Sequence, residues 1–162
     1  MKELEERGLI RRSNSAWASP LVLIKKKDGK ERMCVDYRLL NNRTLKDAYP
    51  LPRVSDILDC LSGAKYFSTL DLKAGYWQVP MESTSCSKTA FPTPVGLFEF
   101  RVMPFGLTNA SGTFQSLMSD ILNPYLFRGI IVYLNDIIVF APSEEKMFEW
   151  LKMYLNRCKK KI

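Results

Sequence analysis

Histidine is absent from the sequence, which has 162 residues. This absence excludes Ser-His-Asp triads, histidine general bases and histidine-ligated metals from the chain. The cysteines are scattered and form no C-x-x-C pair; they are Cys34, Cys60, Cys86 and Cys158. Zinc-ligand spacing is therefore missing, and a disulfide framework is not expected in a chain of this size. We interpret the cysteines as reduced thiols of an intracellular protein.

Long apolar runs are also lacking. Tyr133, Asn135 and Asp136 interrupt the longest ones, so no stretch is typical of a transmembrane helix. Residues 1–7 are charged and do not form the apolar region of a secretory signal. The apolar fraction of 46% is nevertheless sufficient for the core of one domain or of two small lobes. We therefore expect no association with a membrane.

Basic residues are in excess, with 24 Lys and Arg against 17 Asp and Glu and a net charge of +7. Such a charge favours a polyanionic partner, nucleic acid first and an anionic membrane second. Asp28-Gly29 separates two strand-like runs and predicts a β-hairpin. Its tip carries Lys25, Lys26, Lys27, Lys30 and Arg32. On charge alone, this hairpin is either a phosphate clamp or a solubilising surface.

Residues 130–140 contain two runs of β-branched and aromatic residues around a polar tip. The pattern predicts two buried strands joined by a tight turn. Asn135 and Asp136 at the tip are open to two interpretations, because these residue types favour turns as well as chemistry. Asp71 lies between two leucines near the end of a predicted strand, residues 65–72. Burying its carboxylate unpaired is costly, so we expect it at an exposed strand end or beside a cation.

The remaining pattern alternates short helices with strands. Gly8 ends a first helix, residues 11–20 and 36–52 are expected to be loops, and the last helix begins after its N-cap, Ser143. Apolar periodicity and turn residues give the other elements: helices over 2–7, 53–61 and 110–122, and a strand pair over 88–91 and 97–102. We interpret the apolar stripe of the 110–122 helix as core packing.

Seven motifs, in one order, resemble the reverse transcriptases of gypsy-type long-terminal-repeat retrotransposons. They are Trp17-Ala18-Ser19-Pro20, Val35-Asp36-Tyr37-Arg38-Leu39-Leu40-Asn41, Tyr49-Pro50-Leu51-Pro52, Leu70-Asp71-Leu72-Lys73-Ala74-Gly75-Tyr76, Lys88-Thr89-Ala90-Phe91, Met103-Pro104-Phe105-Gly106-Leu107-Thr108-Asn109-Ala110 and Val132-Tyr133-Leu134-Asn135-Asp136. Any one of them is a weak match, but the ordered set is highly specific. The resemblance extends over nearly the whole chain.

The resemblance implies an α+β fold, a right-hand polymerase with an antiparallel palm sheet backed by helices. Residues 1–45 and 79–109 would form the fingers, and residues 46–78 and 110–162 would form the palm. The thumb, the connection and the RNase H domain of the family would follow Ile162 and are absent from this sequence. The chain would belong to a longer Pol polyprotein located in the cytoplasm or a virus-like particle, or in the nucleus.

The family adds deoxynucleotides (dNTPs) to the 3′-OH of a primer on an RNA or DNA template. This reaction requires two Mg²⁺ ions, which Mn²⁺ can replace, and Mg²⁺ is usually held by one or two carboxylates plus phosphates and water. By position, Asp71 and Asp136 match the metal ligands of the family. Tyr133 opens the turn motif and would border the primer end.

Other roles also follow from the resemblance. Lys26 and Arg32 would bind the incoming triphosphate, and Tyr76 would lie under the deoxyribose. Phe105 and Gly106 would line the nucleotide pocket. Gln115 would face the template–primer, although a surface hydrogen bond is an alternative interpretation of this residue.

Three departures from the family pattern bear on activity. Asn135 replaces the first aspartate of the paired carboxylates, and a carboxamide lacks the charge that gathers divalent ions. Ser111-Gly112 replaces a Pro-Ala type sequence, and Gly costs up to about 1 kcal/mol relative to Ala in a helix. The thumb is missing. We therefore expect an impaired polymerase; the alternative is a catalytically dead nucleic-acid-binding remnant or a relic of the element.

Overall fold

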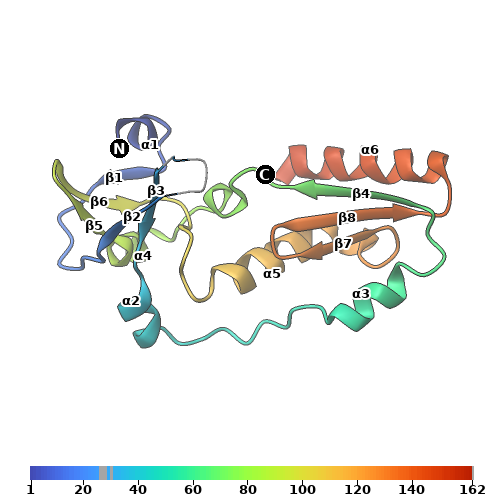
Figure 1. Cartoon of the computed structure of the whole chain (residues 1–162), viewed down its shortest axis with the longest axis horizontal. Helices are drawn as coiled ribbons and strands as arrows, with labels where there is room; N and C mark the ends of the chain where they lie inside the picture. The colour runs from blue at the N-terminus through green and yellow to red at the C-terminus, as the bar shows by residue number, and fades with distance from the viewer. Residues whose placement is uncertain (26–28, 30, 162) are drawn as a thin grey trace. The chain divides into compact units, whose positions relative to one another are not determined.

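The computed structural model describes residues 1–25, 29 and 31–161 and divides into two compact units (Figure 1). Unit 1 comprises Met1–Lys46 and Tyr76–Ala110, and unit 2 comprises Asp47–Gly75 and Ser111–Ile162. Both units mix helices with strands, and every pairing between the named strands is antiparallel. The predicted α+β class is confirmed.

Unit 1 contains two small sheets and several short helices. Its strands are β1 (Ile10–Arg12), β2 (Leu21–Lys25), β3 (Glu31–Val35), β5 (Phe91–Thr93) and β6 (Gly96–Phe100). Its helical segments are α1 (Lys2–Glu6), α2 (Arg38–Arg43), α4 (Ser83–Cys86) and the 3₁₀ turn η2 (Ser87–Thr89), while the 3₁₀ turn η1 (Gly75–Gln78) begins at the last residue of a unit 2 segment. β6 lies between β1 and β5, and the buried side chains of Ile10, Phe91, Phe98 and Phe100 form the core of this sheet.

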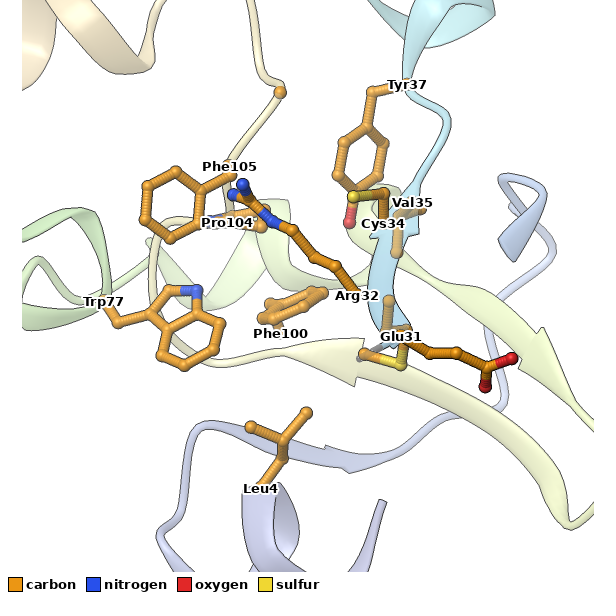
Figure 2. Close-up of a pocket in the computed structure, with 12 residues that line it drawn as sticks. Leu4, Glu31, Arg32, Cys34, Val35, Tyr37, Trp77, Phe100, Pro104 and Phe105 are labelled. Atoms are coloured by element: carbon orange, nitrogen blue, oxygen red, sulfur yellow. The ribbon is translucent and has the colours of Figure 1, made fainter. Parts of the chain in front are cut away.

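The predicted hairpin is the second sheet of unit 1. β2 pairs with β3 in a register that runs from Leu21 opposite Val35 to Lys25 opposite Glu31. The tip residues Lys26, Lys27, Asp28 and Lys30 lie outside the described residues. A cavity of about 430 Å³ lies beside β3 and is lined by residues of unit 1 alone (Figure 2).

Three segments of unit 1 differ from the sequence-based expectation. Residues 11–20 were expected to be a loop, but β1 pairs with β6 through three residues, too few to show a strand period. α2 was also expected to be a loop, and it buries no residue, so it carries no amphipathic stripe. The strand predicted from residue 88 begins only at Phe91, because Thr89 is buried in η2 and its hydroxyl donates to the Cys86 carbonyl over 2.6 Å.

Unit 2 is a three-stranded sheet with helices packed on it. Its elements are α3 (Val54–Cys60), β4 (Tyr66–Asp71), α5 (Ala110–Leu122, whose first residue belongs to unit 1), η3 (Asn123–Tyr125), β7 (Ile130–Tyr133), β8 (Asp136–Ala141) and α6 (Glu144–Lys161). The strand order is β4-β8-β7, with the predicted 130–140 hairpin forming β7 and β8. Ile57 of α3 packs against Ile131 and Phe140, which places α3 on one face of the sheet.

The two long helices of unit 2 begin close to the predicted positions. α5 starts at Ala110 despite the sequence Ser111-Gly112, and its buried stripe includes Phe114 and Met118, as expected for core packing. At the start of α6 the Ser143 hydroxyl accepts a hydrogen bond from the Lys146 amide over 3.3 Å, which confirms the predicted N-cap. In the part of the chain that the structure describes, no helix combines the length and apolar character needed to cross a bilayer. All four cysteines are free thiols.

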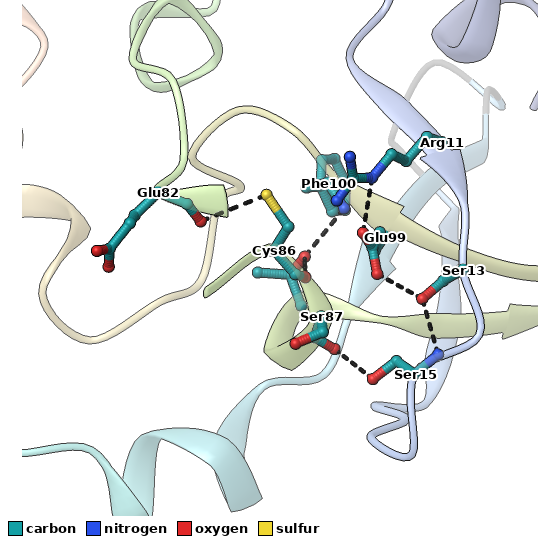
Figure 3. A network of polar contacts seen from close by, with 9 residues as sticks. Arg11, Ser13, Ser15, Glu82, Cys86, Ser87, Glu99 and Phe100 are labelled. Atoms are coloured by element: carbon teal, nitrogen blue, oxygen red, sulfur yellow. Dashed lines mark hydrogen bonds and ion pairs between the residues drawn. The ribbon is translucent and has the colours of Figure 1, made fainter. Parts of the chain in front are cut away.

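Polar contacts tie β1 and the segment after it to the rest of unit 1 (Figure 3). The side chain of Glu99 on β6 is buried, and it accepts hydrogen bonds from the Ser13 hydroxyl and, over 2.7 Å, from Arg11 Nε. Further along, the Ser15 hydroxyl donates to the Ser87 carbonyl over 2.7 Å. Burial acts to raise the pKa of the Glu99 carboxyl, but the hydrogen bonds from Ser13 and Arg11 outweigh it and hold this pKa below its usual value.

Glu99→Gln is expected to destabilise the protein by about 1–2 kcal/mol at pH 7, because it removes a charge-assisted hydrogen-bond acceptor whose partner Arg11 is half exposed. A lowered folded-state pKa contributes stability above the unfolded-state pKa, and this contribution is lost as pH falls through the folded-state pKa. The difference between the wild type and Glu99→Gln should therefore shrink below about pH 4. Urea denaturation at several pH values measures this difference in the free energy of unfolding. The exposed Glu5→Gln serves as a control, and equal stability of the two variants at pH 7 would contradict the prediction.

Candidate active site

Asp71 and Asp136 are directly opposite each other at one end of the unit 2 sheet. β4 and β8 pair from Tyr66 opposite Ala141 to Asp71 opposite Asp136, so the last residue of one strand faces the first residue of the other. Opposed residues of antiparallel strands have Cβ atoms roughly 4.5–5.5 Å apart and side chains on the same face. Both aspartates are exposed. The structure thus brings together two carboxylates that are distant in the sequence.

Tyr133 belongs to the same row across the sheet. It is the cross-strand partner of Asp136 on β7, so its side chain points to the face that carries both aspartates. Because residues of one strand alternate between faces, this is also the face on which Phe140 packs against α3. The predicted site residues Asp71, Asp136 and Tyr133 therefore share one surface of unit 2.

The turn between β7 and β8 consists of Leu134 and Asn135. Leu134 has a φ of 56°, in the left-handed region that residues with a Cβ adopt at a cost. Its amide donates to Gln115 Oε1 over 2.9 Å, and Gln115 Nε2 donates to the Val132 carbonyl over 3.0 Å. One side chain from α5 therefore holds both sides of the turn that precedes Asp136.

This geometry corrects the expectation that Gln115 faces the template–primer. Its side chain is only 2% exposed, and both ends of its amide are bonded to the backbone of β7 and the turn. Gln115 lies on the buried stripe of α5 between apolar neighbours, where sequence periodicity alone does not distinguish a structural amide from a ligand-binding one.

Asn135 is half-buried. Its Oδ1 is buried and has no hydrogen-bond partner among the described residues. A Cβ at Gly75 would lie 3.4 Å from this oxygen and 2.9 Å from Phe114 Cζ, so only glycine fits between them without displacement. Asn135 Oδ1 is therefore not presented to solvent with the two aspartates.

The ligands available to a divalent cation in this part of unit 2 are consequently two exposed carboxylates. Within residues 1–25, 29 and 31–161, no group of three or more His, Cys, Asp or Glu side chains is placed so that it could hold a metal ion. Mg²⁺ prefers hard oxygen ligands and is commonly held by one or two protein carboxylates together with phosphates and water. Asp71 and Asp136 fit this minimal set, whereas the buried oxygen of Asn135 adds nothing to it.

Four of the predicted nucleotide-binding residues gather in unit 1. The Arg32 guanidinium carbon lies 5.9 Å from the centre of the Phe105 ring. The centre of the Tyr76 ring lies 5.1 Å from the centre of the Phe105 ring. Gly106 follows Phe105 with a φ of 93°, and its carbonyl accepts a hydrogen bond from Asn41 Nδ2 over 2.8 Å. Lys26, the fifth predicted member, lies outside the described residues.

Sequence reasoning missed two residues of this cluster. Asn41 also accepts a hydrogen bond from the Thr108 amide over 2.9 Å, so it fixes the turn that carries Phe105 and Gly106. The Trp77 ring packs edge-on against Phe105, with 5.9 Å between the ring centres. Asn41 lies in a motif quoted above and Trp77 directly follows one, but nothing in a motif distinguishes a residue that holds a turn from one that binds a ligand.

Residues 24–161 match the profile of the family described as "Reverse transcriptase (RNA-dependent DNA polymerase)". The chain belongs to the reverse transcriptase family. This confirms the resemblance drawn from the seven motifs.

Curated reverse transcriptase relatives include transposon polyproteins. The chain is 45% identical over 148 residues to the Retrovirus-related Pol polyprotein from transposon 297 of Drosophila melanogaster, and the match covers 88% of the chain. It is 48% identical over 121 residues to an RNA-directed DNA polymerase homolog of Oenothera berteroana, covering 75% of the chain and 85% of that protein. The chain spans only 14% of the length of the transposon 297 polyprotein.

Solved reverse transcriptase structures share the fold. A foamy viral protease-reverse transcriptase in complex with an RNA/DNA hybrid superimposes with a TM-score of 0.89 at 26% identity, covering 99% of this chain and 21% of that one. The same viral enzyme in complex with double-stranded DNA gives a TM-score of 0.88 at 27% identity, covering 98% and 28%. The predicted fold class, a reverse transcriptase fold, is therefore confirmed.

Gln115→Leu is expected to lower the free energy of unfolding by about 2–4 kcal/mol, because it leaves the Leu134 amide and the Val132 carbonyl without their buried partner. Thr113→Ala, at an exposed position on the same helix, should change it by less than about 0.5 kcal/mol. Chemical denaturation compares the two variants, and hydrogen exchange at Leu134 reports the turn directly. If the Leu134 amide is equally protected in both variants, Gln115 does not hold the turn.

Proposed function

We propose that this chain is the fingers and palm part of an RNA-directed DNA polymerase and adds dNTPs to a primer 3′-OH on an RNA or DNA template. Residues 1–45 and 79–109, all in unit 1, would form the fingers. Residues 46–78 and 110–162 would form the palm; most of them lie in unit 2, and residues 46, 76–78 and 110 lie in unit 1. The remaining domains would lie elsewhere in a longer Pol polyprotein, acting in the cytoplasm, a virus-like particle or the nucleus. The observation that carries the proposal is the pairing of Asp71 with Asp136.

In this proposal Asp71 and Asp136 hold Mg²⁺, or Mn²⁺ in its place. When bound, such ions lower the pKa of the attacking hydroxyl and stabilise charge on the transferring phosphate. The chain's own contribution is positional, because the β4–β8 ladder fixes one carboxylate and the Gln115-bonded turn fixes the other. Tyr133, in the same row, would border the primer end.

Unit 1 supplies the groups proposed to bind the dNTP. Arg32 and Lys26 would bind the triphosphate, because guanidinium and ammonium groups pair with phosphate oxygens. Phe105 and Gly106 would line the nucleotide pocket. Tyr76, which is 8% exposed and packs on Phe105, would lie under the deoxyribose and exclude a 2′-OH.

Asn135 weakens this machinery in two ways. Its carboxamide carries no charge, and its oxygen is buried against Gly75 and Phe114. An electrostatic contribution of several kcal/mol to a transition state corresponds to on the order of a thousandfold in rate. We therefore expect the unaltered chain to extend a primer very slowly or not at all.

Asn135→Asp is expected to increase Mg²⁺-dependent primer extension on an RNA template by about a thousandfold. A carboxylate is costly to bury unpaired, so this variant should also be less stable without metal and should gain more thermal stability from Mg²⁺ than the unaltered chain does. Extension assays and thermal unfolding with and without Mg²⁺ measure the two effects.

Controls separate the site from general charge effects. Asp71→Asn and Asp136→Asn should abolish both the extension and the stabilisation by metal in the Asn135→Asp background, whereas the exposed Asp120→Asn on α5 should retain both. Robust extension by the unaltered chain would refute the expected impairment. Salt-dependent binding of a primer–template without extension by any variant would instead favour a nucleic-acid-binding remnant.

A further inference from the structure

The cavity beside β3 extends well beyond the residues proposed to bind nucleotide. Arg32, Phe105 and Gly106 form part of its wall, but the rest is apolar and has no assigned role. These other lining residues include Leu4, Met33, Val35, Trp77 and Phe100. At about 430 Å³, the cavity lies within the range of sites that bind small organic molecules, which are mostly apolar with a few polar groups that fix orientation.

One buried donor in this wall is unused. Trp77 Nε1 is buried and has no hydrogen-bond partner among the described residues, although buried indole N–H groups usually have one. Figure 2 shows the indole nitrogen on the edge of the ring that faces Phe105 and Arg32. The Tyr37 hydroxyl, on the same cavity, is by contrast satisfied by the Thr89 carbonyl over 2.9 Å.

The polar groups of the cavity favour a ligand that accepts hydrogen bonds and carries negative charge. Trp77 and Arg32 both offer N–H donors. Glu31 is the one carboxylate among the described lining residues, and its carboxylate points away from the ring cluster in Figure 2. We propose that this cavity is a binding site for an aromatic monoanion, whose ring packs among Trp77, Phe100 and the aliphatic wall and whose carboxylate or sulfonate is bound by Trp77 Nε1 and Arg32.

The cavity is separate from the proposed metal site, because all its residues belong to unit 1 and none is a proposed metal ligand. It shares Arg32, Phe105 and Gly106 with the proposed dNTP site. A ligand bound in the cavity would therefore occupy Arg32 and compete with the triphosphate of a dNTP. Such ligands would inhibit dNTP binding by this chain.

The three tryptophans make the proposal directly measurable. Each gives one indole N–H signal in a ¹⁵N–¹H spectrum of the full chain, and Trp→Phe variants assign them. With 2-naphthoate as the probe and no nucleic acid or metal, the Trp77 signal should move downfield and saturate, while the signals of Trp17 and Trp150 stay in place. 2-Naphthalenemethanol, which has the same ring but no charge, should bind about tenfold or more weakly.

Two variants test the donors separately. Trp77→Phe retains an aromatic ring but no donor and should weaken 2-naphthoate binding about five- to tenfold, and Arg32→Gln should do so by about tenfold. Trp17→Phe, at an exposed position of unit 1, is the matched control and should bind as the unaltered chain does. A Trp77 signal that does not move at millimolar 2-naphthoate would overturn the proposal, and so would Arg32→Gln binding as tightly as Trp17→Phe. Because the assay contains no primer, failure of the polymerase proposal leaves its result unaffected.

Discussion

The register of β4 against β8 is the constraint on which the proposed metal site depends. A slip of β8 by one residue would turn Asp136 to the opposite face of the sheet, away from Asp71. Ile137 and Val139, both fully buried on β8, oppose such a slip because it would remove them from their packed positions. Apolar residues that take no part in chemistry therefore determine where the two carboxylates lie.

The turn before Asp136 contains an unfavourable backbone conformation that hydrogen bonds within unit 2 compensate. Leu134 adopts a left-handed conformation, and the two hydrogen bonds of Gln115 offset that cost. Asn135 lies beside it with a neutral side chain, which is less costly to bury than a carboxylate. Replacing aspartate by asparagine therefore favours a stable turn at the same position where it removes a charge that the family's chemistry uses.

The sequence predicts the elements of unit 2 better than those of unit 1, for physical reasons. β7 and β8 are continuous apolar runs on either side of a polar turn, α5 has an apolar stripe of helical period, and the expected positions of all three agree with the structure. α2 buries none of its residues, and β1 is three residues long, so neither has a period to detect. The residues missed or misinterpreted within the site, Asn41 and Gln115, act through hydrogen bonds to distant backbone atoms, which only the folded chain brings together.

Two buried side-chain polar atoms lack a partner in the described part of the chain, Trp77 Nε1 and Asn135 Oδ1. Folded proteins contain few such atoms, since each costs about 1–3 kcal/mol, and local rules of stability are broken most often where a protein has a function. Here one lies in each unit, Trp77 in contact with Phe105 of the proposed nucleotide pocket and Asn135 next to Asp136. Unsatisfied hydrogen bonding thus points to the same two regions as the sequence motifs do. It is an independent physical reason to place binding in unit 1 and metal chemistry, intact or lost, in unit 2.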